Sequence, residues 1–429
     1  MKKITSVSEV SRAQTNNRFT TITAGLVVCA CAMLPFSRSV EIPMALLTFI
    51  GLYFGVTEPA LRANHAIRQF SVIFLLFFVP MLLALPDAVN LEISAAKTLV
   101  AIRYYLAGIT IIFFLRSDVK RVFPWISAIL LIWSIDAFIQ VYTGTDVFGY
   151  HYSGGRINGM FGGLKDGLKL GWGIVIFFPV CLVWFIDRFS WPVTLFLGGI
   201  IFYALVLSGT RSAWVVGILE IILLSVYLLY TKKIRWVSMV LVSVMIVGVA
   251  VAGVQSSSGL MARVDRVTAV VGNPDYQTVD HALSRRLPIW ETAIRMIEDN
   301  WLNGVGVRGF RYAYTAYAEE GNHFVAHLPA GQDVSLATHA HQLILEVMAE
   351  TGVIGLIGLV GIFVQVVRIW LASSSYGRWW SLPFAVALVS LLFPFNSLLA
   401  FYSSWFAQQF WLLMALFIAV STSNRDPIV

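Results

Sequence analysis

Residues 67–86 read IRQFSVIFLLFFVPMLLALP, and this stretch decides the class of the protein. Its only charged side chain, Arg68, lies near one end, and a helix of this length crosses a hydrocarbon core of about 30 Å. The rest of the chain is similar, because 58% of its 429 residues are hydrophobic and 12% are charged, against about 25% charged in soluble domains. We therefore predict an all-α polytopic membrane protein, since backbone polar groups in lipid must be paired within the segment.

Twelve apolar stretches are long enough to be membrane spans. They are residues 19–36, 42–57, 67–86, 96–115, 123–142, 172–187, 191–208, 212–230, 235–254, 341–367, 380–397 and 400–421. We expect three regions: spans one to nine in 1–254, a large helical loop in 255–340, and spans ten to twelve in 341–429. The first stretch follows four Lys or Arg and lacks a small-residue cleavage pattern, which predicts a retained span.

The basic residues predict which side each loop faces. Every short segment on the side of the N-terminus contains Lys or Arg, whereas the short breaks on the other side contain only Arg38. By the positive-inside rule both termini lie in the cytoplasm and the large loop lies outside. The net charge of +7 then reflects topology, so we do not expect nucleic acid as a partner. The three cysteines lie in apolar stretches, which excludes a disulfide framework.

The large loop contains an amphipathic pattern at helical spacing. Pro288 suits the first turn of this helix and Gly304 suits its stop. The apolar positions are Leu287, Trp290, Ala293, Ile294, Ile297 and Trp301. The pattern predicts a helix that either lies along the membrane surface or packs onto the spans.

Arg211 occupies the tight outer turn between the seventh and eighth spans. Ser208, Thr210 or Ser212 can cap the helix that follows, and the N-terminus of a helix attracts anions. A guanidinium group adds two parallel donors for phosphate oxygens. The turn therefore predicts a phosphate clamp; the alternative is an interfacial arginine whose head reaches water.

Arg285 and Arg286 begin the predicted loop helix. Consecutive helical residues point about 100° apart, so at most one of the two should face a shared pocket. We favour Arg286, which lies four residues before Trp290 on the same face. The alternative is a solvated pair of arginines.

His339 and His341 lie where the loop enters the tenth span. If the span already begins there, the two side chains point about 200° apart and cannot line one site. No Cys partner and no H-E-x-x-H pattern accompanies them, so we expect no metal and no cofactor. A neutral imidazole is a good general base for a sugar hydroxyl, although a structural histidine is the alternative for either residue.

Four stretches of sequence resemble the O-antigen ligase and polymerase superfamily, and its ligase branch in particular. They are GRINGMF at 155–161, SGTR at 208–211, RLPIW at 286–290 continuing to NGVG at 303–306, and HQLILE at 341–346 with Gly352 and Gly355. Gln342 departs from the family, where Asn or Ser is more frequent, and this change leaves the role of the histidine intact. The twelve spans and the large loop between spans nine and ten resemble the family as well, which implies a fold like that of the GT-C glycosyltransferases.

The resemblance implies a metal-independent, inverting glycosyltransferase in the bacterial inner membrane. Its donor would be O-antigen on undecaprenyl pyrophosphate and its acceptor lipid A-core, both in the periplasmic leaflet among membrane lipids. We assign the donor pyrophosphate to Arg211 and Arg286, and the acceptor proton to His341. Arg156, Arg285 and His339 are further candidates for substrate contact.

Other functions use similar parts. An O-antigen polymerase or a protein O-oligosaccharyltransferase shares the lipid-linked donor, and the sequence separates these poorly from a ligase. A transporter would place charges at mid-membrane in broken helices. The cations here gather at the outer rim, and Asp136 within the fifth span is an exception that the sequence does not explain.

Overall fold

The computed structural model describes residues 7–116, 118–152, 157–163, 170–234, 247–248, 251, 258–272, 274–326, 335–394 and 400–423. These residues form helices and turns without any strand, and the only sheet-like pairing among them is the isolated bridge between Thr145 and His151. The all-helical fold class predicted from the sequence is confirmed.

The long helices form one bundle. They are α1 (Val7–Ala32), α2 (Glu41–Thr57), α4 (His65–Leu83), α5 (Leu91–Leu115), α6 (Phe123–Thr143), α7 (Leu170–Arg188), α8 (Trp191–Leu207), α9 (Arg211–Tyr230), α16 (Leu343–Ala372), α17 (Ser375–Leu391) and α18 (Ser404–Ser421). Short pieces connect some of them: the 3-10 helices η1 (Leu34–Val40), η2 (Val119–Val122) and η3 (Gly159–Gly163), and α3 (Pro59–Ala63). Asparagines cap two of the long helices, since Asn64 accepts from the Ala66 N–H (2.9 Å) and Asn90 from the Ile93 N–H (3.0 Å).

Eight of the described helical segments are long and apolar enough to cross a membrane. They are Arg38–Thr57, His65–Leu83, Leu91–Leu115, Val119–Thr143, Leu170–Arg188, Arg211–Tyr230, Leu343–Ala372 and Ser404–Ser421. Three more expected spans coincide with the shorter helices Asn17–Ala32 and Trp191–Leu207 and with α17. Most of the expected ninth span, 235–254, lies outside the described residues. The chain is therefore a multi-pass membrane protein, and the count of twelve stays a prediction.

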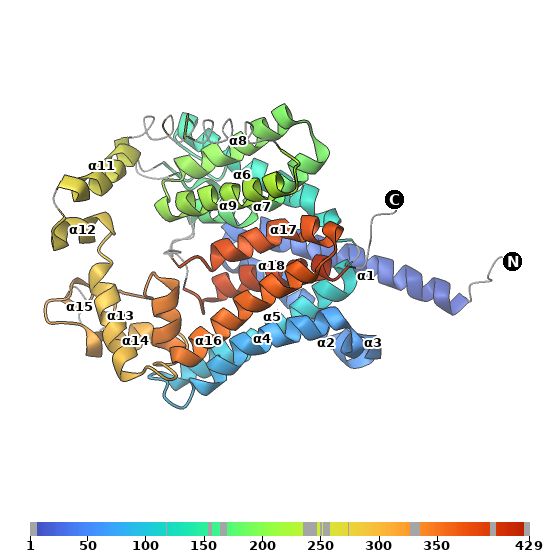
Figure 1. Ribbon diagram of the computed structural model, residues 1–429, viewed down its shortest axis with the longest axis horizontal. Coiled ribbons are helices and arrows are strands. Elements are labelled where there is room, and N and C mark those ends of the chain that lie inside the picture. Colours follow the sequence, from blue (N-terminus) through green and yellow to red (C-terminus); the bar gives the residue numbers. More distant parts are fainter. Residues whose placement is uncertain are drawn as a thin grey trace.

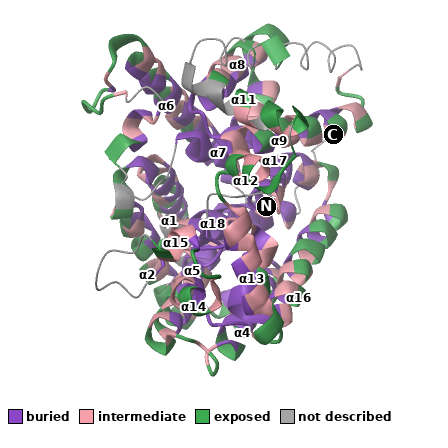
Figure 2. Ribbon diagram, turned by 90° about the vertical axis from the view of Figure 1, so that its left-hand side faces the viewer, coloured by how far each residue is buried: buried purple, intermediate pink, exposed green. Residues whose placement is uncertain are grey.

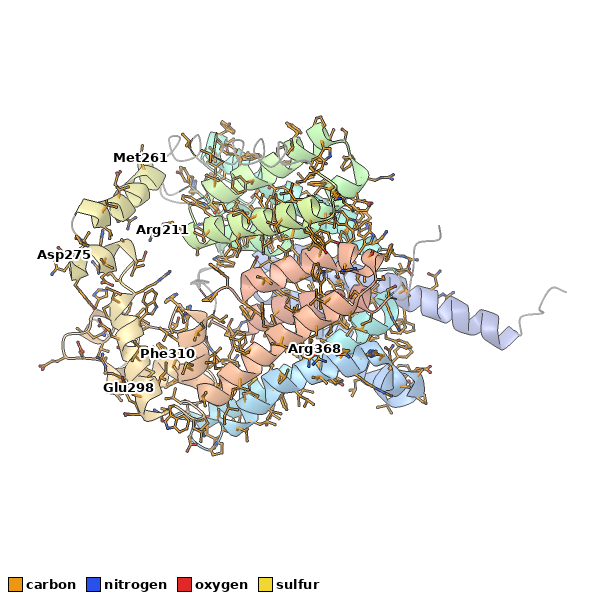
Figure 3. The ribbon with its side chains drawn as sticks, viewed as in Figure 1. Arg211, Met261, Asp275, Glu298, Phe310 and Arg368 are labelled. Atoms are coloured by element: carbon orange, nitrogen blue, oxygen red, sulfur yellow. The ribbon has the colours of Figure 1, made fainter. Side chains whose placement is uncertain are left out.

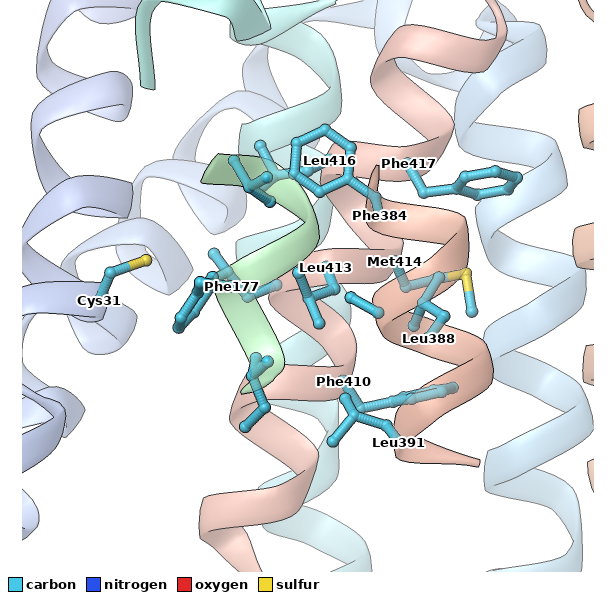
Figure 4. Packing of buried hydrophobic residues seen from close by; sticks show 14 of the residues in the cluster. Cys31, Phe177, Phe384, Leu388, Leu391, Phe410, Leu413, Met414, Leu416 and Phe417 are labelled. Carbon is cyan, nitrogen blue, oxygen red and sulfur yellow. The ribbon is translucent and has the colours of Figure 1, made fainter. Parts of the chain in front are cut away.

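The centre of the bundle is formed by α17 together with α7 and α18, each of which packs against it. Side chains such as Phe177, Phe384 and Phe410 meet there with negligible exposure (Figure 4). In Figure 2 the ribbons of α7 and α18 are mostly buried, whereas α2 and α16 at the edges carry exposed residues. Exposed apolar residues such as Phe49 and Ile357 are expected on a surface that faces lipid.

The large loop folds as a small helical layer beyond one end of the bundle (Figure 1). Its helices are α11 (Ser258–Gly272), α12 (Tyr276–Ala282), α13 (Leu287–Asp299), α14 (Phe310–Tyr317) and α15 (His323–Ala326). We call this end of the bundle the loop end. The layer has its own apolar core, in which Met296 of α13 and Tyr314 of α14 are fully buried and to which Ala349 of α16 contributes.

The amphipathic helix predicted in this loop is present as α13, with Pro288 in its first turn. The predicted apolar face is confirmed at Ala293 and Ile297 and was wrong at Ile294 and Trp301. The buried residues are Ile289, Thr292, Ala293 and Met296, whereas Ile294 is 46% exposed and Trp301 lies beyond the helix and is 60% exposed. The physical reason is that α13 packs against α14 and α16, so the tertiary contacts select a face that includes Thr292. The Thr292 hydroxyl is accommodated there by donating to the Pro288 carbonyl (2.7 Å).

Candidate active site

The turn before α9 brings Arg211 to the loop end. Gly209 adopts a left-handed conformation (φ +63°), which lets the chain reverse between α8 and α9. Thr210 stands at the N-cap position, but its side chain makes no capping hydrogen bond. The expected capping by a hydroxyl at this position is therefore wrong: the Ser208 hydroxyl bonds the Leu205 carbonyl (2.6 Å) in the preceding helix instead.

Arg211 connects the bundle to the large loop. Its Nη1 donates to the Ala282 carbonyl (2.9 Å) and its Nη2 donates to the Ser284 hydroxyl (2.6 Å). Figure 3 shows Arg211 at the end of α9, on the side of the loop helices. The guanidinium group thus lies beside the turn that precedes Arg286. Arg211 and its partner Ala282 are 71 residues apart in the chain.

The turn between α12 and α13 sends its two arginines in different directions. Ser284 and Arg285 both have left-handed backbones (φ +63° and +60°), and Asp280 braces the turn by accepting from the Leu287 N–H (2.9 Å). The Arg285 Nη1 lies 3.4 Å from Nε2 of His323, on the exposed side of the loop. Arg286 is the N-cap residue of α13 and acts electrostatically on His339.

The two histidines of the loop end meet, contrary to the expectation from helical geometry. Residues 338–342 are not helical, because α16 begins only at Leu343 and His341 has a left-handed backbone (φ +54°). As a result the rings of His339 and His341 lie 3.8 Å apart between centroids, at 44° to one another. Gln342 starts α16 by accepting from the Leu345 N–H (2.5 Å). The expectation that these side chains point apart was wrong, since it assumed that the span begins at residue 341.

His339 is the more enclosed of the pair, with 7% of its surface exposed, whereas His341 is half-buried. Nδ1 of His339 lies 3.0 Å from the Thr338 hydroxyl, and its Nε2 is buried without a hydrogen-bond partner among the described residues. The Ala340 carbonyl between the two histidines accepts from the indole of Trp290 (3.1 Å). Helix α13 is thereby fixed to the histidine segment.

Helix α16, which follows the histidine segment, is broken at Gly352. Gly352 leaves the helical conformation (φ +62°, ψ −162°), so Val353 and Ile354 cannot bond the carbonyls of Ala349 and Glu350 one turn earlier. Those two carbonyls instead accept from the backbone N–H groups of Val305 (2.8 Å) and Gly306 (3.1 Å), in the loop between α13 and α14.

The two N–H groups that lose their helical partners at the break are also paired with the loop between α13 and α14. The Val353 N–H donates to the Trp301 carbonyl (2.8 Å), and the Ile354 N–H donates to the Leu302 carbonyl (3.3 Å). A side chain at Gly352 would overlap the backbone of Leu302, and one at Gly304 would overlap the backbone of Glu350. Both glycines have positive φ. Gly304 and Gly352, which lie far apart in the sequence, are thus required by a single contact, whereas a side chain at Gly306 would overlap Ala88.

This contact places Arg308, a residue that the sequence analysis did not single out. Arg308 has a left-handed backbone (φ +60°) and donates its N–H to the Glu350 carboxylate (2.7 Å). Its Nη1 is buried and has no hydrogen-bond partner within the described structure. Glu346 is buried one turn before Glu350 and accepts from the Phe401 N–H (2.8 Å). Two carboxylates at positions i and i+4 in an apolar stretch were the available signal.

Burial and positive charge keep His339 neutral. Desolvation is the largest cause that lowers its pKa well below 6.5, followed by the charges of His341, Arg308, Arg286 and Arg311. These residues come from three separate segments of the chain. The loop end therefore concentrates positive charge around two imidazoles, an arrangement suited to an anionic ligand and to proton transfer.

Arg156 lies outside the described residues. Residues near it in the chain are hydrogen-bonded to α6, and these bonds explain the presence of Asp136 in that helix. Asp136 accepts from the N–H groups of Val147 (3.0 Å) and Met160 (2.7 Å), and Gln140 accepts from the Gly159 N–H (2.9 Å). Asp136 is thus a structural residue that fixes the described parts of the segment between α6 and α7.

No three His, Cys, Asp or Glu side chains come together as metal ligands in the described part of the chain. The three cysteines are likewise unpaired with one another.

Residues 193–360 match a family model described as O-antigen ligase. The match covers Arg211, Arg285, Arg286, Arg308, His339 and His341. It ends after the break at Gly352 and includes α13, α14 and the histidine segment. No curated protein matches the chain.

Proposed function

Since this match supports membership of the O-antigen ligase superfamily, we propose that the protein transfers O-antigen polysaccharide from undecaprenyl pyrophosphate to lipid A-core. The reaction takes place in the periplasmic leaflet of the bacterial inner membrane and needs no metal. The observation that carries the proposal is that arginines of α13 and of the segment after Gly306 surround the two histidines at one end of a membrane bundle, while Arg211 of α9 holds the turn that precedes Arg286.

The donor diphosphate binds between Arg211 and Arg286. Arg211 stands in the first turn of α9, whose N-terminus adds a favourable dipole, and Arg286 stands at the start of α13. Guanidinium groups offset the charge that develops on a departing diphosphate without a metal ion. Arg308 adds a further positive charge close to His339.

His341 acts as the general base. The acceptor hydroxyl attacks the anomeric carbon, its proton passes to His341, and the bond from that carbon to the diphosphate oxygen breaks with its electron pair on the leaving group. The configuration at the anomeric carbon inverts. His339 packs against His341 and, being neutral, does not repel the proton that His341 accepts.

The loop layer excludes water from this chemistry. Helix α13 is held over the histidines by the bond from Trp290 to Ala340, and its Met296 side is packed on α14. Lys and Arg in the short loops of the opposite side favour a periplasmic position for this layer.

The test is reconstitution of the purified full-length protein in liposomes with undecaprenyl-pyrophosphate-linked O-antigen. One arm contains lipid A-core, a second contains the donor alone, and a third contains a candidate protein acceptor. Glycan attached to lipid A-core supports the ligase. Longer lipid-linked glycan in the second arm would instead identify a polymerase, and glycan on protein would identify an oligosaccharyltransferase.

A further inference from the structure

A polar cavity of about 890 Å³ lies at the end of the bundle opposite the loop end. It is enclosed where α4 and α17 begin and where α5, α16 and α18 end. Helix α16 starts beside His341 and, after its break at Gly352, continues to the cavity; about 24 Å of unbroken helix lie between Gly352 and Arg368. Figure 3 shows Arg368 of α16 well away from Arg211 and Phe310.

The lining of the cavity is basic and polar. Arg116, Arg368 and His65 contribute to it together with Gln69, Gln365 and serine residues, and none of the described lining residues is Asp or Glu. An unbalanced pair of guanidinium groups at the rim of a membrane protein favours an anion over a cation or a neutral solute.

The two arginines differ in their present contacts. Arg116 is oriented by the Thr422 carbonyl, which accepts from its Nε (3.1 Å) and also from its Nη2. Arg368 is exposed and makes no hydrogen bond or ion pair with the residues that the structure describes. One guanidinium group is therefore fixed in position and the other is available to close on a ligand.

Two more features lie at the same cavity. Ser421, which is 6% exposed, is among the lining residues, and its hydroxyl is buried and has no hydrogen-bond partner among the described residues. A buried hydroxyl without a partner is costly unless a ligand or water satisfies it. The helices α4 and α17 also begin here, at His65 and just after Ser374, and direct the positive ends of their dipoles to the cavity.

We propose that this cavity is a binding site for a phosphate ester. The volume is far larger than a phosphate ion requires, so the phosphate belongs to a larger molecule. Arg116 and Arg368 bind the phosphate oxygens from two sides, and the Ser421 hydroxyl donates to one of them. The same chemistry is offered by the headgroup of an anionic phospholipid and by a soluble phosphate compound.

The test measures binding to the purified full-length protein in detergent by native mass spectrometry, with phosphatidylglycerol, dioleoylglycerol and inorganic phosphate as separate probes. Arg368→Ala removes one charge-assisted contact, so its affinity for the phosphate-bearing probe should fall roughly tenfold. The matched control is Arg68→Ala. Arg68 is an exposed arginine on the same end of α4 that does not line the cavity, and its loss should leave the affinity unchanged.

The probes separate the two sources of phosphate. Loss of phosphatidylglycerol binding in Arg368→Ala, with no binding of inorganic phosphate, identifies a lipid headgroup; competition by inorganic phosphate identifies a soluble compound. Ser421→Ala provides a second variant with a smaller loss. Equal binding of both phosphate probes by wild type, Arg368→Ala and Arg68→Ala, tight binding of dioleoylglycerol in their place, or no binding at all would overturn the proposal.

Discussion

The imidazole rings of His339 and His341 are in contact, with 3.8 Å between their centroids, although only Ala340 separates the two residues in the chain. The left-handed backbone at His341 makes this possible. One ring is enclosed and neutral, with Arg286 and Arg308 acting on it electrostatically, and the other is half-buried. The pair can therefore be divided into a positioning residue and a base.

Replacement of the base should slow chemistry and spare binding. We expect His341→Ala to lower the rate of glycan transfer by about 10²- to 10⁴-fold, with little change in donor affinity, measured by single-turnover transfer in liposomes. His151→Ala is the control, because His151 is an exposed histidine of another outer segment. Wild-type turnover in His341→Ala would remove this residue from the mechanism.

Glycan transfer should be slower with lysine than with arginine at position 211. Lysine keeps the charge and loses the two parallel donors, so Arg211→Lys should reduce kcat/KM by about ten- to a hundredfold. Ser284→Ala provides the comparison, since it removes the loop partner of Arg211 and leaves the guanidinium group in place. If both variants lose the same activity, Arg211 serves only to hold the loop.

Stability should depend on pH through His339. Its pKa lies well below 6.5 in the folded protein, so the unfolded state binds more protons as the pH falls below about 6.5. The free energy of unfolding should therefore decrease between pH 6.5 and the lower folded pKa, and be unaffected by this group above that range. Tm measured at pH 7.5 and 5.0 should fall less in His339→Asn than in the wild type. An identical fall in both would show that His339 does not titrate as proposed.

The break in α16 should not tolerate a side chain. Gly352→Ala would strain a positive φ and overlap the Leu302 backbone, at a cost of roughly 2–4 kcal/mol. Gly199→Ala is the matched control, since Gly199 is helical and a methyl group there meets no atom within 4 Å. Thermal unfolding in detergent should separate the two variants, and equal Tm values would contradict the role of Gly352.

Chelation provides an independent check on the chemistry. Glycan transfer should proceed at an unchanged rate in excess EDTA, because the departing diphosphate is met by guanidinium groups in the proposed reaction. An activity that is lost in EDTA and restored by Mg²⁺ or Mn²⁺ would contradict the metal-independent scheme.

The sequence predicted the fold class and the positions of most long helices, because apolar length and charge are local properties. It also placed a helix that begins at Pro288 and stops at Gly304, where α13 spans Leu287–Asp299, and it identified Arg211 and Arg286 as candidates. It could not give the face of α13, since that depends on packing against α14 and α16. It missed Arg308 because the position of this residue depends on the exchange of hydrogen bonds around Gly352. This exchange joins segments that are distant in the chain, and Arg308 and its partner Glu350 are 42 residues apart.

Arg211 uses two guanidinium nitrogens to hold the Ala282 carbonyl and the Ser284 hydroxyl. A guanidinium group has five N–H donors, two on each terminal nitrogen and one on Nε. Arg211 can therefore hold this turn and contact a diphosphate at once. The turn would fix the direction of the guanidinium plane before the lipid-linked substrate arrives, so that less conformational entropy is lost on binding.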